Sequence, residues 1–89
     1  MTIWRIETCK AATGYRSTAS IYNLIKLGLW PKAVSIGIRS VGRPSDEIIA
    51  INAARIAGQT DDQIRDLVKR LHFKRNELIA TFSGDQNGA

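Results

Sequence analysis

Residues 13–28 read TGYRSTASIYNLIKLG, and this stretch decides the fold of the chain. Gly14 sits where a tight turn between two helices needs a positive φ, and Ser17 or Thr18 can cap the helix that follows. Gly28 stands where a helix ends. Three apolar residues recur at helical spacing and share one face: Ile21, Leu24 and Ile25. Together these features predict the turn and second helix of a helix-turn-helix.

The helix face opposite Ile21 is small, polar and cationic, since about 100° per residue places Ala19, Asn23 and Lys26 there, flanked by Ser20 and Tyr22. Ser, Thr and Asn can exchange hydrogen bonds with base edges or phosphates, Ala can touch a thymine methyl group, and Lys can neutralise a phosphate. We therefore predict that this helix contacts double-stranded DNA. The residues expected to do so are Arg16, Ser17, Thr18, Ala19, Ser20, Tyr22, Asn23 and Lys26.

The charge of the chain is unevenly distributed. The 89 residues, 44% of them apolar, suffice for one small domain with a modest core, and they carry a net charge of +5. Residues 1–45 hold +6 of this charge and the remainder holds −1. A basic half around a predicted recognition helix favours a polyanionic partner, while a solvated surface with a chance bias is the alternative.

The composition argues against several classes of function. Because no apolar run approaches the roughly 20 residues that span a bilayer, and charged residues crowd the N-terminus, we expect a cytoplasmic protein that joins the nucleoid when bound to DNA. One cysteine, Cys9, and one histidine, His72, cannot form a disulfide or a structural zinc site within the chain. We therefore expect no metal, no cofactor and no enzymatic activity.

Helical and extended segments alternate before residue 44. Residues 1–6 fit either a short strand or an extended arm, and residues 7–13 fit a short helix. After Gly28 the pattern changes to period 2, which predicts strands over residues 33–36 and 39–42 with a turn at 37–38. Such a hairpin beside a helix-turn-helix is called a wing, and it commonly contacts the DNA backbone or the minor groove. The predicted wing contacts are Lys32, Arg39, Ser40 and Arg43, and the alternative is a hairpin whose arginines only keep a sheet edge soluble.

Two further helices follow the hairpin. Ser45 is expected to cap the first, which is apolar over much of its circumference and should be central to the core. The segment Thr60–Gln63 reads as a capping box for the second, followed by the apolar stripe Ile64, Leu67, Val68 and Leu71. Asp61 and Arg65, and Asp66 and Arg70, stand at i, i+4 and are expected to pair. Residues 83–89 are polar, which predicts a flexible tail.

The expected fold is mainly α with a small β-hairpin wing, a winged helix-turn-helix of about four helices. One domain should cover residues 1–82.

The series TG, RS, IYNLIK, WPKAV, IGIRSVG and AARIAG resembles the AlpA family of phage-type regulators, over about residues 4–75. These are small winged helix-turn-helix proteins related to excisionases and distantly to MerR-type domains. The resemblance implies that the helix over residues 17–27 enters the major groove and that the hairpin over residues 35–41 is the wing. The chain departs from the family pattern by one additional residue between Gly14 and Ile21, and by Arg43 where a tryptophan often stands.

The resemblance also implies two related functions. Members activate transcription of integrase or prophage genes, or act as recombination directionality factors that bend DNA during excision. Integrase or RNA polymerase would then be a partner, and protomers would assemble as homo-oligomers or head to tail on DNA. A different function remains open, namely a protein-interaction adaptor or antirepressor that uses the last helix and the apolar residues Leu78, Ile79 and Phe82.

Overall fold

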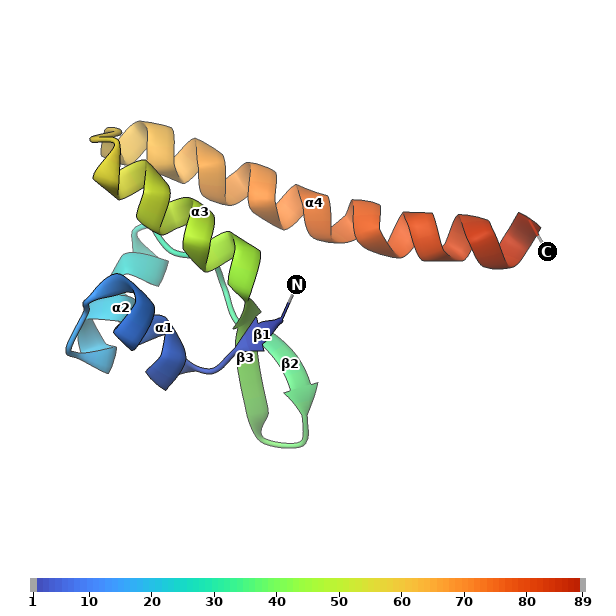
Figure 1. The fold of residues 1–89 in the computed structure, drawn as a ribbon, viewed down its shortest axis with the longest axis horizontal. Coiled ribbons are helices and arrows are strands. Elements are labelled where there is room, and N and C mark those ends of the chain that lie inside the picture. The colour runs from blue at the N-terminus through green and yellow to red at the C-terminus, as the bar shows by residue number, and fades with distance from the viewer. Residues whose placement is uncertain (1, 89) are drawn as a thin grey trace.

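The computed structural model describes the backbone of residues 2–88 and the side chains of residues 2–79 (Figure 1). In this part of the chain, four helices and three strands follow in the order β1, α1, α2, β2, β3, α3, α4. The strands form one antiparallel sheet with β3 in the middle. The predicted fold class, mainly helical with a small hairpin, is confirmed.

The helix-turn-helix consists of α1 (Ile6–Thr13) and α2 (Thr18–Lys26). Gly14 ends α1 with φ +83°, a conformation that side-chain-bearing residues rarely adopt, so the predicted turn glycine is confirmed. Cys9 of α1 and Ile21 of α2 are fully buried and lie in the same core cluster. Burial raises the pKa of the Cys9 thiol, in keeping with a core residue.

The sheet joins the N-terminus to the hairpin. Residues 3–4 form a short strand, β1 (Ile3–Trp4), which pairs with β3 (Ser40–Pro44), and β3 also pairs with β2 (Val34–Gly37). A Cβ at Gly42 would lie 2.6 Å from Ile3 Cγ2, so β1 can approach β3 only because residue 42 is glycine. Both hairpin strands begin one residue later than predicted, and the turn falls on residues 38–39.

Helix α3 (Ser45–Ile56) supplies buried side chains from one face. Ile48, Ile51 and Ala54 lie in the core, whereas Ile56 is 81% exposed. The prediction that Ser45 caps this helix is wrong. Its N–H donates to the Thr2 carbonyl at 2.6 Å and its Oγ accepts from the Thr2 N–H at 3.1 Å, so Ser45 fixes the N-terminal segment instead.

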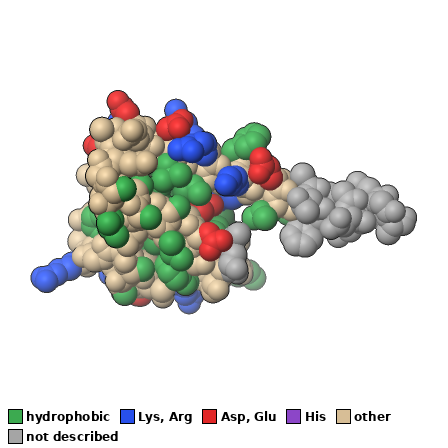
Figure 2. Space-filling model, turned by 45° about the horizontal axis from the view of Figure 1, so that its top comes forward, with side chains coloured by type: hydrophobic (Ala, Val, Ile, Leu, Met, Phe, Trp, Pro, Cys, Tyr) green, Lys and Arg blue, Asp and Glu red, His purple; other side chains and the backbone are tan. Residues whose placement is uncertain are grey.

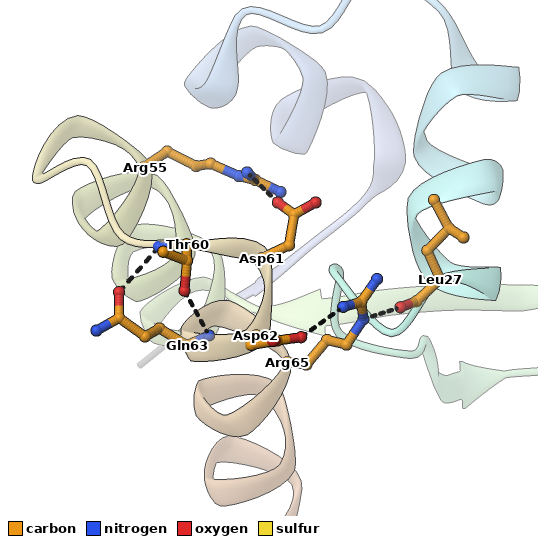
Figure 3. A network of polar contacts seen from close by, with 7 residues as sticks. All are labelled: Leu27, Arg55, Thr60, Asp61, Asp62, Gln63 and Arg65. Atoms are coloured by element: carbon orange, nitrogen blue, oxygen red, sulfur yellow. Dashed lines mark hydrogen bonds and ion pairs between the residues drawn. The ribbon is translucent and has the colours of Figure 1, made fainter.

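Helix α4 (Asp61–Gly88) begins with the predicted capping box (Figure 3). The Gln63 N–H donates to Thr60 Oγ1 at 3.2 Å, and the Thr60 N–H donates to Gln63 Oε1 at 2.9 Å. The predicted apolar stripe is confirmed, since its four residues are buried or pack against the core. Of the two predicted ion pairs only the later one forms: the earlier is replaced by Arg55 with Asp61 and by Arg65 with Asp62.

The first half of α4 packs on α3, and its C-terminal half projects well beyond the body of the molecule (Figure 1). Apolar side chains near and on this projecting part are exposed: Phe73, Leu78 and Ile79. Figure 2 also shows hydrophobic patches on the body. The backbone of α4 continues over residues 83–88, where the sequence predicts a flexible tail. The side chains of residues 80–89, Phe82 included, lie outside the described part of the chain. The flexibility of the tail therefore remains a prediction. No described helix has the length and apolarity needed to cross a membrane.

A buried ion pair fixes α4 against the start of α3. Arg75 Nε donates to Glu47 Oε2 at 2.7 Å, and a second guanidinium nitrogen donates both to Glu47 Oε1 and, at 2.9 Å, to the Lys32 carbonyl. One turn earlier on α4, His72 Nε2 accepts the Lys32 N–H at 3.1 Å. Both polar groups of the Lys32 backbone are therefore bound to α4, which fixes the segment that leads into the hairpin.

The His72 contact makes stability dependent on pH. Burial lowers the pKa of His72 below its usual value near 6.5, and the Arg75 and Lys32 cations lower it further against the opposing effect of Glu47. As the pH falls, His72 therefore becomes protonated in the unfolded chain at a higher pH than in the folded chain. We expect full stability above about pH 6.5 and a progressive loss as the pH falls from there toward the folded-state pKa. Thermal unfolding between pH 5 and 7 checks this, with His72→Gln expected to flatten the slope; an unchanged slope in that variant would assign it to other groups.

Candidate nucleic-acid interface

Helix α2 presents the predicted polar face to solvent. Ile21, the centre of the opposite face, is buried in the core, whereas Tyr22 is 57% exposed. Except for Thr18, which is half-buried, all the residues predicted to contact DNA from this segment are exposed: Arg16, Ser17, Ala19, Ser20, Tyr22, Asn23 and Lys26. The structure thus places these side chains where a ligand could reach them, and their contact with DNA remains a prediction.

The start of α2 is not held as predicted. Ser17 occupies the N-cap position, but no side-chain oxygen caps the helix. Thr18 Oγ1 instead accepts a hydrogen bond from Lys10 Nζ at 3.3 Å, and Lys10 also lies 3.2 Å from Glu7. The first turn of α2 therefore has backbone N–H groups without a side-chain cap, which leaves them available to acceptors outside the chain.

The end of α2 is fixed by α4, through a contact of Arg65 that the sequence does not predict. Arg65 Nε donates to the Leu27 carbonyl at 2.8 Å, while its Nη1 pairs with Asp62 (Figure 3). A cation at a helix C-terminus satisfies a free carbonyl and interacts favourably with the helix dipole. Arg65 thus sets the position of α2. The sequence shows its spacing of three from Asp62 and of four from Asp61, and nothing there indicates Leu27 as its partner.

The wing, residues 34–44, presents one exposed cation, and a second stands just before it. Lys32 precedes it and Arg39 lies in its turn, and both side chains are exposed. Ser40 accepts a hydrogen bond from Arg5 at 2.8 Å, which links the exposed arginine before α1 to the first residue of β3. Arg5 was not among the predicted contacts, because its proximity to the wing depends on the pairing of β1 with β3.

Arg43 is predicted to be one of the wing contacts, but it is not on the surface. The side chain is 3% exposed and its Nε donates to the Pro31 carbonyl at 2.8 Å. Burial also lowers the pKa of its guanidinium. The residue holds the start of the hairpin from inside, and it cannot contact a phosphate in this conformation.

A hollow of about 320 Å³ lies between α2 and the wing. It brings exposed Tyr22 of α2 and Arg39 of the wing to one side of the molecule, while α4 lies on the other side of the body (Figure 1). The lining residues are Arg5, Ile6, Glu7, Tyr22, Ala33, Arg39, Val41 and Arg43. Two exposed cations, Arg5 before α1 and Arg39 in the wing, thus line a concave surface beside the polar face of α2, and cations in this position suit a phosphate backbone.

Comparison with known proteins identifies a family for the part of the chain that forms this surface. The model of the family described as "Prophage CP4-57 regulatory protein (AlpA)" matches residues 2–50, which span β1, both helices of the helix-turn-helix, the wing and the first half of α3. A search of curated proteins and a search of solved structures each found no match. Because the family match covers more than half of the chain, including every segment that lines the hollow, this protein belongs to the AlpA family of prophage regulatory proteins.

Proposed function

We propose that this protein is a sequence-specific double-stranded DNA-binding regulator, in which α2 enters the major groove and the wing contacts the backbone or the adjacent minor groove. One observation carries the proposal: the exposed, small and polar face of α2 lies beside the wing, and exposed Tyr22 of α2 and exposed Arg39 of the wing line the same hollow. The major groove admits an α-helix, and phosphate contacts from flanking cations fix its register.

The proposed contacts divide into two groups. Asn23 is the best candidate for base readout, since an amide can pair bidentately with adenine, and the exposed side chains of Ala19, Tyr22 and Lys26 lie on the same helix face. Backbone contacts are assigned to exposed cations before and after α2, which are Arg16, Lys32 and Arg39, with Ser40 beside them. Arg5 joins this group because it lines the hollow and binds Ser40.

Regulation would take place in the cytoplasm by one of two routes. The protein activates integrase or prophage genes with RNA polymerase as a partner, or it acts as a recombination directionality factor that recruits integrase. Both routes use the same DNA surface, and head-to-tail binding of protomers to direct repeats fits either one. A direct excision assay with the purified protein separates them, because only the second route predicts excision.

Retention of DNA fragments in the presence of competitor tests the proposal. Fragments that span the gene for this protein and the nearest integrase gene are mixed with purified protein at physiological salt, with an excess of random DNA. Selective retention of particular fragments is the expected result. Retention that is lost equally from all fragments would show that the basic half is a nonspecific anchor.

The shape of α4 favours a second candidate function, that of a protein-interaction adaptor. Its projecting half and the exposed Phe73, Leu78 and Ile79 offer apolar surface to a partner protein. This function would become the leading one if no fragment were selectively retained.

The wing should contribute to binding of every DNA sequence alike. Arg39→Ala is expected to weaken binding to specific and random duplexes and to reduce the slope of log K against log salt by about 0.9, the value of one phosphate contact. Titrations at several salt concentrations measure this slope. Lys69→Ala, which removes an exposed cation from α4, is the matched control and should leave the slope unchanged. If Arg39→Ala and Lys69→Ala gave equal slopes, Arg39 would not contact a phosphate.

A further inference from the structure

The tip of the wing is apolar and unusually exposed. Ile38, in the turn between β2 and β3, is 94% exposed, more than any other exposed large hydrophobic side chain among those described. Ile36 and Val41 on the hairpin strands are also exposed. Ile38 therefore adds nothing to the core, and its presence at the tip calls for an explanation other than folding.

The backbone of the turn has an unfavourable conformation at a residue that carries a side chain. Arg39 has φ +61° and is the one non-glycine residue with positive φ in the described part of the chain. Two-residue hairpin turns ordinarily use Asn-Gly or Asp-Gly, which adopt such conformations at less cost. This turn has Ile-Arg instead. Strain retained at an exposed tip is typical of functional positions.

A register shift beside the tip also indicates that the tip is a functional position. The pairing of β2 with β3 is irregular between Ser35 and Gly37. Irregularities of this kind bend a strand, increase its twist and re-aim the side chains beyond them. The tip thus combines an exposed branched hydrophobic group, a cation next to it and a locally redirected backbone.

We propose that Ile38 is an apolar wedge that inserts into a base step from the minor groove and bends the DNA. The inference rests on the proposed function. Apolar side chains, isoleucine among them, partly unstack base steps in this way and kink the duplex by about 20–90°. Flexible pyrimidine–purine steps are the ones most easily opened.

The surroundings of the tip favour DNA over a second copy of the chain. Arg39 is adjacent to Ile38 in the turn, the exposed Arg5 donates a hydrogen bond to Ser40 directly after the turn, and Lys32 is exposed just before the wing. Two wings meeting tip to tip would bring their Arg39 cations together, which is unfavourable, whereas phosphates on both sides of a minor groove complement these charges.

Ring closure by ligase tests the proposal without a known binding site. A random-sequence duplex well below the persistence length of about 150 bp closes inefficiently unless a protein bends it. Wild-type protein is expected to promote closure, Ile38→Ala to lose most of this effect, and Ile38→Leu to retain it because the wedge is preserved. Since Ile38 makes no core contact, Ile38→Ala should fold normally. Ile56→Ala, which truncates another exposed isoleucine at the far end of α3, is the control.

A second readout detects the unstacking itself. With 2-aminopurine in a pyrimidine–purine step of a selectively retained fragment, fluorescence should rise on adding wild-type protein and stay low with Ile38→Ala. Equal closure and equal fluorescence for wild type and Ile38→Ala would overturn the wedge while leaving specific binding intact. Closure that depends on Ile38 without selective retention would support the wedge and contradict the proposed specificity.

Discussion

Replacing Arg75 with alanine is expected to lower the free energy of unfolding by about 3–5 kcal/mol. The substitution leaves the Glu47 carboxylate, in a residue that is 5% exposed, without its bidentate partner, and an unpaired buried charge is expensive. It also removes the hydrogen bond to the Lys32 carbonyl. Urea unfolding followed by circular dichroism measures the loss.

Two further variants make the test specific. Arg70→Ala breaks an exposed ion pair with Asp66 on the same helix and should cost less than about 1 kcal/mol. Replacing both members of the buried pair, as Glu47→Leu with Arg75→Met, should recover most of the stability because no charge is then left buried. A loss in Arg75→Ala no larger than that in Arg70→Ala would contradict the importance of the pair.

Asn23→Ala is expected to cost about 1–3 kcal/mol of binding free energy on a specific site and very little on random DNA. The side chain is exposed on α2, so its removal should leave folding intact. Competition titrations with specific and random duplexes measure both affinities. Asn76→Ala, which truncates an exposed asparagine on α4, is the matched control. An equal loss on both duplexes would show that Asn23 does not read bases.

Local patterns in the sequence predict much of the fold. The glycine at position 14, the stripe around Ile21 and the Thr60–Gln63 capping box depend on neighbours within a few residues, and the structure has all three. The capping prediction for Ser45 is wrong because its Oγ and N–H bind Thr2, a partner 43 residues away. Tertiary contacts of this kind override a local capping preference.

The sequence predicts the exposed residues of the candidate site, but not the residues that hold α2 and the wing in place. The polar face of α2 follows from helical periodicity and is exposed as expected. Arg43 reads as a surface cation, and its burial becomes evident only when Pro31 is seen to accept its hydrogen bond. The role of Arg65 likewise depends on how α4 crosses the end of α2. Charge and spacing do not reveal which arginines support the surface and which are presented on it.

The central claim is that α2 enters the major groove and that the wing contacts the backbone or the adjacent minor groove of the same duplex. Methylation protection with dimethyl sulfate tests it most directly, because this reagent modifies guanine N7 in the major groove and adenine N3 in the minor groove. On a selectively retained fragment, we predict protected guanines at the position of α2 and protected adenines at the position of the wing, about half a helical turn or 5 bp away. Saturating protein that protected neither atom would contradict this account.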